Sequence, residues 1–120
     1  MKFTIPGTLS GLNEYTLKSR ANKYASNQMK QVNQQIVSIA IRQAKLGKVQ
    51  NYPVTIKTTW YEPDNRRDAD NVIFAKKFIN DSLVINGILL GDGRKYVKGF
   101  IDEVLVDKEN PRIEVEIKEG

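Results

Sequence analysis

The sequence predicts an α+β fold: a single domain with a mixed β-sheet and two main helices. Three observations lead to this prediction. Residues 54–61 and 112–117 are rich in β-branched and apolar residues, as strands are. Residues 14–46 and 69–83 repeat apolar side chains at the three- and four-residue spacing of helices. The length of 120 residues suits one domain, which we place over residues 1–120.

The first half of the chain is predicted to form a strand and a long helix. Residues 2–5 alternate polar and apolar side chains, which is typical of a short strand, and residues 7–13 are rich in Gly, Ser and Thr, as loops are. The helix over 14–46 would span ~45 Å if it were continuous, so a break is expected near Ser26-Asn27. Its apolar side is expected to contain Val32, Ile36, Ile39 and Ile41.

The second half is predicted to form a strand, a helix and two further strands. The strand over 54–61 lies between Pro53 and Pro63, both at positions that strands tolerate. A helix follows over 69–83, and the last two strands cover 96–106 and 112–117, with 107–111 as the hairpin loop between them. The predicted order of elements is therefore β-α-β-α-β-β.

The composition excludes several kinds of chemistry. The chain has no Cys and no His. Disulfides, thiolate zinc sites, cysteine nucleophiles and histidine bases are therefore excluded. Catalysis would need carboxylates, Lys, Tyr, Ser, Thr or a metal ion with oxygen ligands. No signal peptide or apolar run of membrane-spanning length is visible, so we expect no membrane association and a cytoplasmic location.

The charge is unevenly divided along the chain. Residues 1–50 contain eight Lys or Arg and one acid, a net charge of +7, whereas residues 51–120 contain eleven Lys or Arg and thirteen acids, a net charge of −2. The total is the formal charge of +5. A basic half favours a polyanionic partner such as nucleic acid, although lysines on a solvated helix face are also common.

Aspartates form the most informative pattern in the sequence. Asp68 and Asp70 follow the clearest strand and open the second predicted helix, and Asp92 lies between two glycines. Carboxylate oxygens suit Mg²⁺ or Mn²⁺. The competing interpretation is that Asp68 or Asp70 caps the helix and that Asp92 is a turn residue. Arg66-Arg67, directly before the acids, could hold a polyanion near them.

Two lysines on the helix that begins at Asp70 are candidates for the same site. Lys77 is seven residues beyond Asp70 and returns within about 20° of its direction, whereas Lys76 lies roughly 120° away. Lys77 is therefore preferred. It could also be a solvated lysine, or form a helical ion pair with Asp81, four residues further on.

These motifs together resemble the RusA family of Holliday junction resolvases. The family pattern is a basic stretch, then D-x-D-N, a helix with Lys and D-A-L, and an acidic turn. Here the corresponding residues are Arg66-Arg67, the sequence DADN at 68–71, Lys77, DSL at 81–83 and Asp92. The resemblance covers residues 53–100 well and the first 50 residues loosely. The family lysine normally lies four residues after the second Asp, where this chain has Phe74. Counting back from DSL favours Lys77 and leaves Lys76 as the alternative.

The resemblance implies a homodimeric, Mg²⁺-dependent endodeoxyribonuclease that resolves four-way DNA junctions by paired symmetric nicks, in DNA recombination and repair. It implies Asp68, Asp70 and Asp92 as catalytic metal ligands for Mg²⁺, with Mn²⁺ as a substitute, and Lys77 as the catalytic lysine. The charge pattern and the resemblance together give the candidate DNA-binding residues Arg66, Arg67, Lys76, Arg94, Lys18, Arg20 and Lys23. Two alternatives remain open: a non-catalytic DNA-binding domain with a basic helical face, and a structural protein whose basic face meets an acidic protein.

Overall fold

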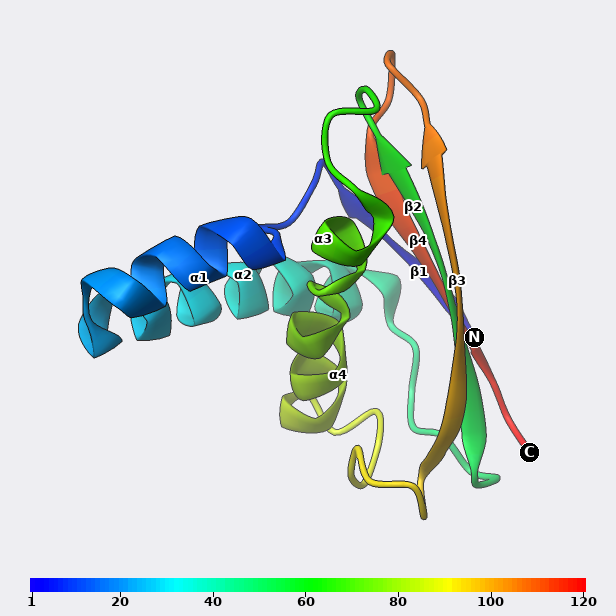
Figure 1. Cartoon of the computed structure of the whole chain (residues 1–120). Helices are drawn as coiled ribbons and strands as arrows, with labels where there is room; N and C mark the ends of the chain where they lie inside the picture. The colour runs from blue at the N-terminus through cyan, green and yellow to red at the C-terminus, as the bar shows by residue number, and fades with distance from the viewer.

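The strand β2 (Val54–Glu62) is the centre of the fold. Its residues alternate strictly between buried and partly exposed, so one face of the strand, with Val54, Ile56 and Trp60, enters the core. The computed structural model describes all residues, 1–120, and shows a four-stranded mixed sheet with helices on one side of it (Figure 1). The fold is thus α+β with a mixed sheet, as predicted.

The order of strands in the sheet is β1-β4-β2-β3. The strand β4 (Arg112–Lys118) runs antiparallel to both of its neighbours, β1 (Lys2–Pro6) and β2. The strand β3 (Val97–Val106) lies parallel to β2 at the edge of the sheet.

The predicted hairpin over 107–111 is therefore wrong, because β2 lies between β3 and β4. The physical reason is the helical crossover between β2 and β3, which returns the chain parallel to β2 on one side and leaves only the other side for β4. Residues 107–111 instead pass over the end of β2, where the backbone N–H of Asp107 donates to the carbonyl of Glu62 at 2.8 Å.

The long helix predicted over 14–46 is two helices, α1 (Leu12–Ala21) and α2 (Lys23–Ala44). The break lies at Asn22, not at Ser26-Asn27. Asn22 has an extended backbone, and its side chain accepts a hydrogen bond from the N–H of Ala25 at 2.7 Å, so it caps the start of α2. Figure 1 shows α1 and α2 side by side in an arm that extends away from the sheet.

The buried side of α2 agrees with the prediction only at Ile41. Val37, Ala40 and Ile41 are buried, whereas Val32, Ile36 and Ile39 are 51, 37 and 50% exposed. A polar residue explains the error. Asn33 is buried on the core side and joins the loop before α1, with its Oδ1 accepting from the N–H of Ser10 at 2.9 Å. A prediction from the spacing of apolar residues alone does not place a polar residue such as Asn33 on the buried side. Val32, Ile36 and Ile39 form an apolar stripe on the exposed side of α2.

The helix predicted over 69–83 is also divided, into α3 (Ala69–Ile73) and α4 (Lys76–Ile85). At the break, hydrogen bonds to the third residue back replace the α-helical pattern, from Ala75 to Val72 and from Lys77 to Phe74, both 3.2 Å long. The centre of the Phe74 ring lies 5.2 Å from the centre of the Tyr15 ring and 5.8 Å from that of Phe78. The break changes the angular relation between Asp70 and the two lysines, so the 20° offset predicted for Lys77 does not apply.

None of the helices is long and apolar enough to cross a membrane.

Candidate active site

The turn between β2 and α3 is held in place by Glu62 and Arg67. Glu62 is only 5% exposed, and Arg67 donates to both of its carboxylate oxygens at 2.8 Å. Arg67 also donates to the carbonyl of Leu9 at 3.0 Å. The hydrogen bond with Glu62 raises the pKa of Arg67 above its ordinary value. Arg67 therefore fastens the turn that carries the aspartates to β2 and to the N-terminal loop.

Asp68 and Asp70 lie at the start of α3 with exposed carboxylates. Asp68 is at the N-cap position, but its side chain makes no capping hydrogen bond. The carboxylate of Asp70 accepts only from the adjacent N–H of Asn71, at 2.9 Å. Neither takes part in an ion pair. The simple capping interpretation is thus unsupported for Asp68, and both carboxylates are available to a ligand.

Asn71 fixes α3 against the beginning of α1. Its Oδ1 accepts from the N–H of Asn13 at 2.9 Å. A Cβ at Gly11 would lie 2.5 Å from that same oxygen, so only glycine permits this close approach. Within the DADN sequence, Asn71 therefore has a structural role, whereas Asp68 and Asp70 are exposed at the surface.

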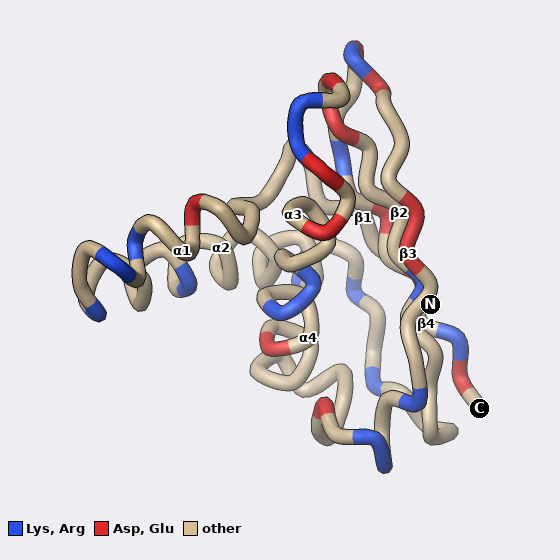
Figure 2. Tube along the Cα trace, in the orientation of Figure 1, with Lys and Arg blue, Asp and Glu red and all other residues tan.

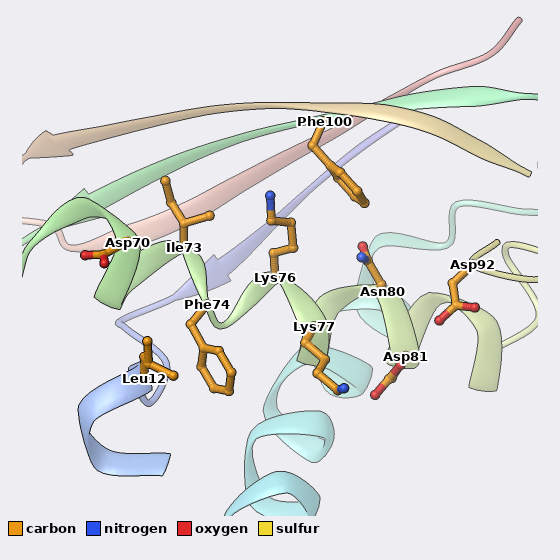
Figure 3. A pocket seen from close by; sticks show the side chains of 10 residues that line it. All are labelled: Leu12, Asp70, Ile73, Phe74, Lys76, Lys77, Asn80, Asp81, Asp92 and Phe100. Atoms are coloured by element: carbon orange, nitrogen blue, oxygen red, sulfur yellow. The ribbon is translucent and has the colours of Figure 1, made fainter. Parts of the chain in front are cut away.

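A groove of about 670 Å³ runs along the α3–α4 junction and meets the edge strand β3. Figure 3 shows Asp70 and Asp92 at opposite ends of the groove, with Lys76, Lys77 and Asn80 between them. The other lining residues are Leu12, Ile73, Phe74, Asp81 and Phe100. Of the four residues predicted to act in catalysis, the groove brings together Asp70, Lys77 and Asp92, and Asp68 lies outside its lining.

Lys76 is engaged within the protein. Its ammonium lies 2.9 Å from the Oδ2 of Asp102 and 4.4 Å from the centre of the Phe100 ring. The other oxygen of Asp102 accepts a hydrogen bond from the indole N–H of the buried Trp60 at 3.0 Å. Asp102 therefore links α4 to the sheet through Lys76, and the charge of Lys76 is largely compensated.

Lys77, in contrast, is exposed and has no ion-pair partner. The helical pair between Lys77 and Asp81, considered from the sequence, is not formed. Asp81 instead lies 3.8 Å from the ammonium of Lys30 and accepts from Gln34 at 3.2 Å, both on α2. Of the two candidate lysines, Lys77 is the one with a free charge in the groove.

The three predicted metal ligands do not form one cluster in the single chain. No group of three or more Asp or Glu side chains is close enough together to hold a metal ion. Asp92 lies in the loop between α4 and β3 without a side-chain partner, and the Tyr96 ring packs against Gly91, where a Cβ would lie 2.7 Å from it. Mg²⁺ commonly uses only one or two carboxylates and completes its octahedron with water and substrate phosphate. The exposed pair of Asp68 and Asp70 fits that smaller requirement.

Most of the predicted DNA-binding cations are exposed. Lys18, Arg20 and Lys23 lie on the α1–α2 arm, and Figure 2 shows basic residues toward its far end. Arg94 is exposed in the loop after Asp92. Arg66 is also exposed and lies 3.5 Å from Asp64, a surface ion pair. Arg67 and Lys76 differ from the others, because each is bound to a carboxylate of the protein itself.

Asn80, Phe100 and Asp102 are residues near the groove that the sequence pattern does not predict. Asp102 could have been suspected from the sequence, because a Trp buried in a strand needs an acceptor for its indole N–H. A carboxylate in a neighbouring strand can be that acceptor. Asn80 and Phe100 could not have been suspected, because a helical Asn and a strand Phe are ordinary. Only the parallel pairing of β2 with β3 brings them to the same groove.

No protein-family model matches this chain, and no curated protein matches it.

Proposed function

We propose that the protein is a Mg²⁺-dependent endodeoxyribonuclease that cuts branched DNA, with four-way junctions as its substrate. The observation that supports this most is the pair Asp68 and Asp70, exposed and free of cationic partners, beside a groove in which Lys77 also has a free charge. Together with the resemblance to the RusA family, this favours phosphodiester hydrolysis over a purely structural role for the acids.

The residues of the chain would divide the reaction as follows. Asp68 and Asp70 would hold the metal ion through their carboxylate oxygens. The chemistry that a bound Mg²⁺ or Mn²⁺ would supply there is Lewis acidity toward the scissile phosphate and toward water. The ammonium of Lys77 stabilises the negative charge that develops on the phosphate. Asp92, at the other end of the groove, remains a predicted ligand.

DNA binding is proposed to depend on the arm and the turn. Lys18, Arg20 and Lys23 on the arm, with Arg66 and Arg94, would contact phosphates, and such contacts require no particular base sequence.

We include the homodimer in the proposal because two symmetric cuts need two sites related by a two-fold axis. The exposed stripe of Val32, Ile36 and Ile39 gives a second copy an apolar surface. A sedimenting mass of one chain, free and on DNA, would contradict the dimer. A cytoplasmic location also remains part of the proposal.

The decisive experiment compares cleavage of a synthetic four-way junction with and without Mg²⁺, using the wild type and Asp70→Asn. We expect paired nicks only with the wild type and Mg²⁺, and junction binding by both proteins in EDTA. Asp64→Asn is the matched control, because Asp64 is an exposed aspartate of the same turn that pairs with Arg66. Full cleavage by Asp70→Asn with unchanged metal dependence would falsify the assignment.

A non-catalytic DNA-binding domain is the second candidate, supported by the failure of the three aspartates to form one cluster. It predicts junction binding without cleavage in either Mg²⁺ or Mn²⁺.

A further inference from the structure

Asn80 contains an unsatisfied buried atom at the wall of the groove. Its Oδ1 is the one buried side-chain nitrogen or oxygen of the chain without a hydrogen-bond partner. Buried polar atoms are almost always paired, and leaving one unpaired is costly. Asn80 lines the groove, and Figure 3 shows its amide directed to the same space as Phe100 and Lys76. A ligand with an N–H donor would satisfy it.

Phe100 offers a partly free aromatic ring beside this amide. The ring is on the edge strand β3, and the residue is 42% exposed although its strand position faces the helices. Lys76 lies over the ring at 4.4 Å, and its charge is compensated by Asp102. Phe100 is also one of the residues that line the groove. A planar group could stack there without meeting an uncompensated charge.

The remaining properties of the groove fit the same occupant. Its volume of about 670 Å³ is within the range of ligand sites, ~300–1,000 Å³. Leu12, Ile73 and Phe74 add apolar lining. Asp70 lies at one end of the same groove, so a planar group bound at Phe100 and the phosphate that Asp70 is proposed to serve would occupy one continuous surface. Aromatic stacking with a few polar contacts is how proteins hold unpaired bases.

From these observations we infer that the groove binds one unpaired nucleobase of the DNA substrate, stacked on Phe100 and donating a hydrogen bond to the Oδ1 of Asn80. Each of the four bases has an N–H donor on its Watson–Crick edge, and in a duplex that donor is already used. The groove therefore selects DNA with an open base, as at a branch point, rather than a particular sequence. This inference rests on the proposed function, because it assumes that DNA is the substrate.

The test is binding in EDTA to four-way junctions in which one nucleotide at a time, within two positions of the branch, is replaced by an abasic one. The proteins are the wild type, Phe100→Leu, Asn80→Ala and the control Ile101→Ala. Ile101 is the next residue of β3, is 46% exposed and points to the opposite side of the sheet. EDTA removes the metal ion that the proposed cleavage of DNA requires. The dissociation constants measured in EDTA therefore report binding alone.

We expect at least one position at which loss of the base weakens wild-type and Ile101→Ala binding about tenfold. Phe100→Leu and Asn80→Ala should be nearly insensitive to the same loss. The inference would be overturned if base removal had no effect on wild-type binding at any position, or the same effect on the binding of all four proteins. The scan with the wild-type protein tests the first of these outcomes even if a variant does not fold.

Cleavage with Mg²⁺, measured separately, distinguishes the two proposals. Cleavage without base coupling overturns only the inference about the groove. If the loss of one base weakens binding through Phe100 and Asn80 but the junction is not cleaved, the proposed nuclease activity is overturned. The inference about the groove then holds for a DNA-binding domain. A protein that neither binds nor cleaves the junction overturns both.

Discussion

Arg66 and Arg67 are adjacent in the sequence, yet they occupy very different environments. The side chain of Arg66 is 89% exposed and pairs loosely with Asp64, whereas that of Arg67 is 23% exposed and donates twice to the buried Glu62. Both were predicted to contact DNA from the sequence. The structure leaves Arg66 available for this task and gives Arg67 an internal one.

The first prediction uses this pair of neighbours. Arg67→Ala should lower the free energy of unfolding by about 3 kcal/mol, because it leaves the carboxylate of Glu62 buried and unpaired. Arg66→Ala should change it by less than about 0.5 kcal/mol, as exposed positions usually do. Urea unfolding of both variants checks the difference. Equal stabilities, with weaker DNA binding for Arg67→Ala, would show that Arg67 acts on DNA instead.

The second prediction separates Lys76 from Lys77. Lys77→Ala should reduce the single-turnover rate of junction cleavage by about 100-fold, since a free charge near the phosphate is lost, with no change in stability. Lys76→Ala should lower the free energy of unfolding by about 2 kcal/mol, because Asp102 keeps only its bond from Trp60. The cleavage rate and the unfolding curve of each variant are the measurements. The opposite pattern, with Lys77→Ala fully active, would assign the catalytic role to Lys76.

The residues of the candidate groove were easier to predict from the sequence than the contacts around it, although Asp68 is not among the lining residues. The predicted positions of Asp70, Lys77 and Asp92 all line the groove, and local motifs suffice to suggest them. The partners of Arg67 and Lys76 could not be predicted, because Glu62 and Asp102 become neighbours only through the turn after β2 and the parallel pairing of β3. Pairing between distant segments leaves little trace in a local pattern.

At the scale of elements, the errors come from polar residues at structural positions. Asn22 ends α1 and begins α2, and Asn33 lies on the buried side of α2, so neither break nor buried side follows from apolar spacing. Strand positions were predicted well because β-branched residues mark them directly. Strand pairing was not, since β3 and β4 are consecutive along the chain and yet lie on opposite sides of β2.

The connection between β3 and β4 leads to a third prediction, for pH. Arg112 bonds Asp107 and Glu114 at 2.8 Å each and lies 3.8 Å from the centre of the Tyr61 ring. The hydrogen bond from Arg112, followed by one from the N–H of Asn110, lowers the pKa of Asp107. A carboxyl whose pKa is lower in the folded state stabilises the fold when it is ionised.

This contribution is therefore complete above the unfolded pKa of about 4 and is lost as the pH falls through the lower pKa of the folded state. In Asp107→Asn the free energy of unfolding should fall less steeply between about pH 4 and pH 2 than in the wild type. Urea unfolding at several pH values measures this. Parallel pH profiles for the two proteins would mean that the Arg112 contact does not stabilise the fold.

At the scale of the whole molecule, the unequal charge of the two halves becomes an arrangement in space. Five of the eight Lys or Arg residues of the basic first half lie on the arm of α1 and α2. The acids of the second half lie along the turn, the groove and the sheet (Figure 2). Of the arm's cations, Lys18, Arg20 and Lys23 form no ion pair with an acid of the chain, so binding of a phosphate backbone by these three residues can be tested apart from the chemistry of the aspartates.

The fourth prediction concerns Lys18, Arg20 and Lys23, replaced together by Ala. Each phosphate contact contributes about 0.9 to the slope of log K against log salt, so the slope for junction binding should decrease by roughly 1–3 units. The matched control replaces Lys2, Lys57 and Lys118, which lie on the side of the sheet away from the helices. It removes the same charge of three and should leave the slope within ~0.5 units if no phosphate lies there. Equal decreases for both triple variants would mean that net charge alone attracts DNA, and that the arm has no particular place in binding it.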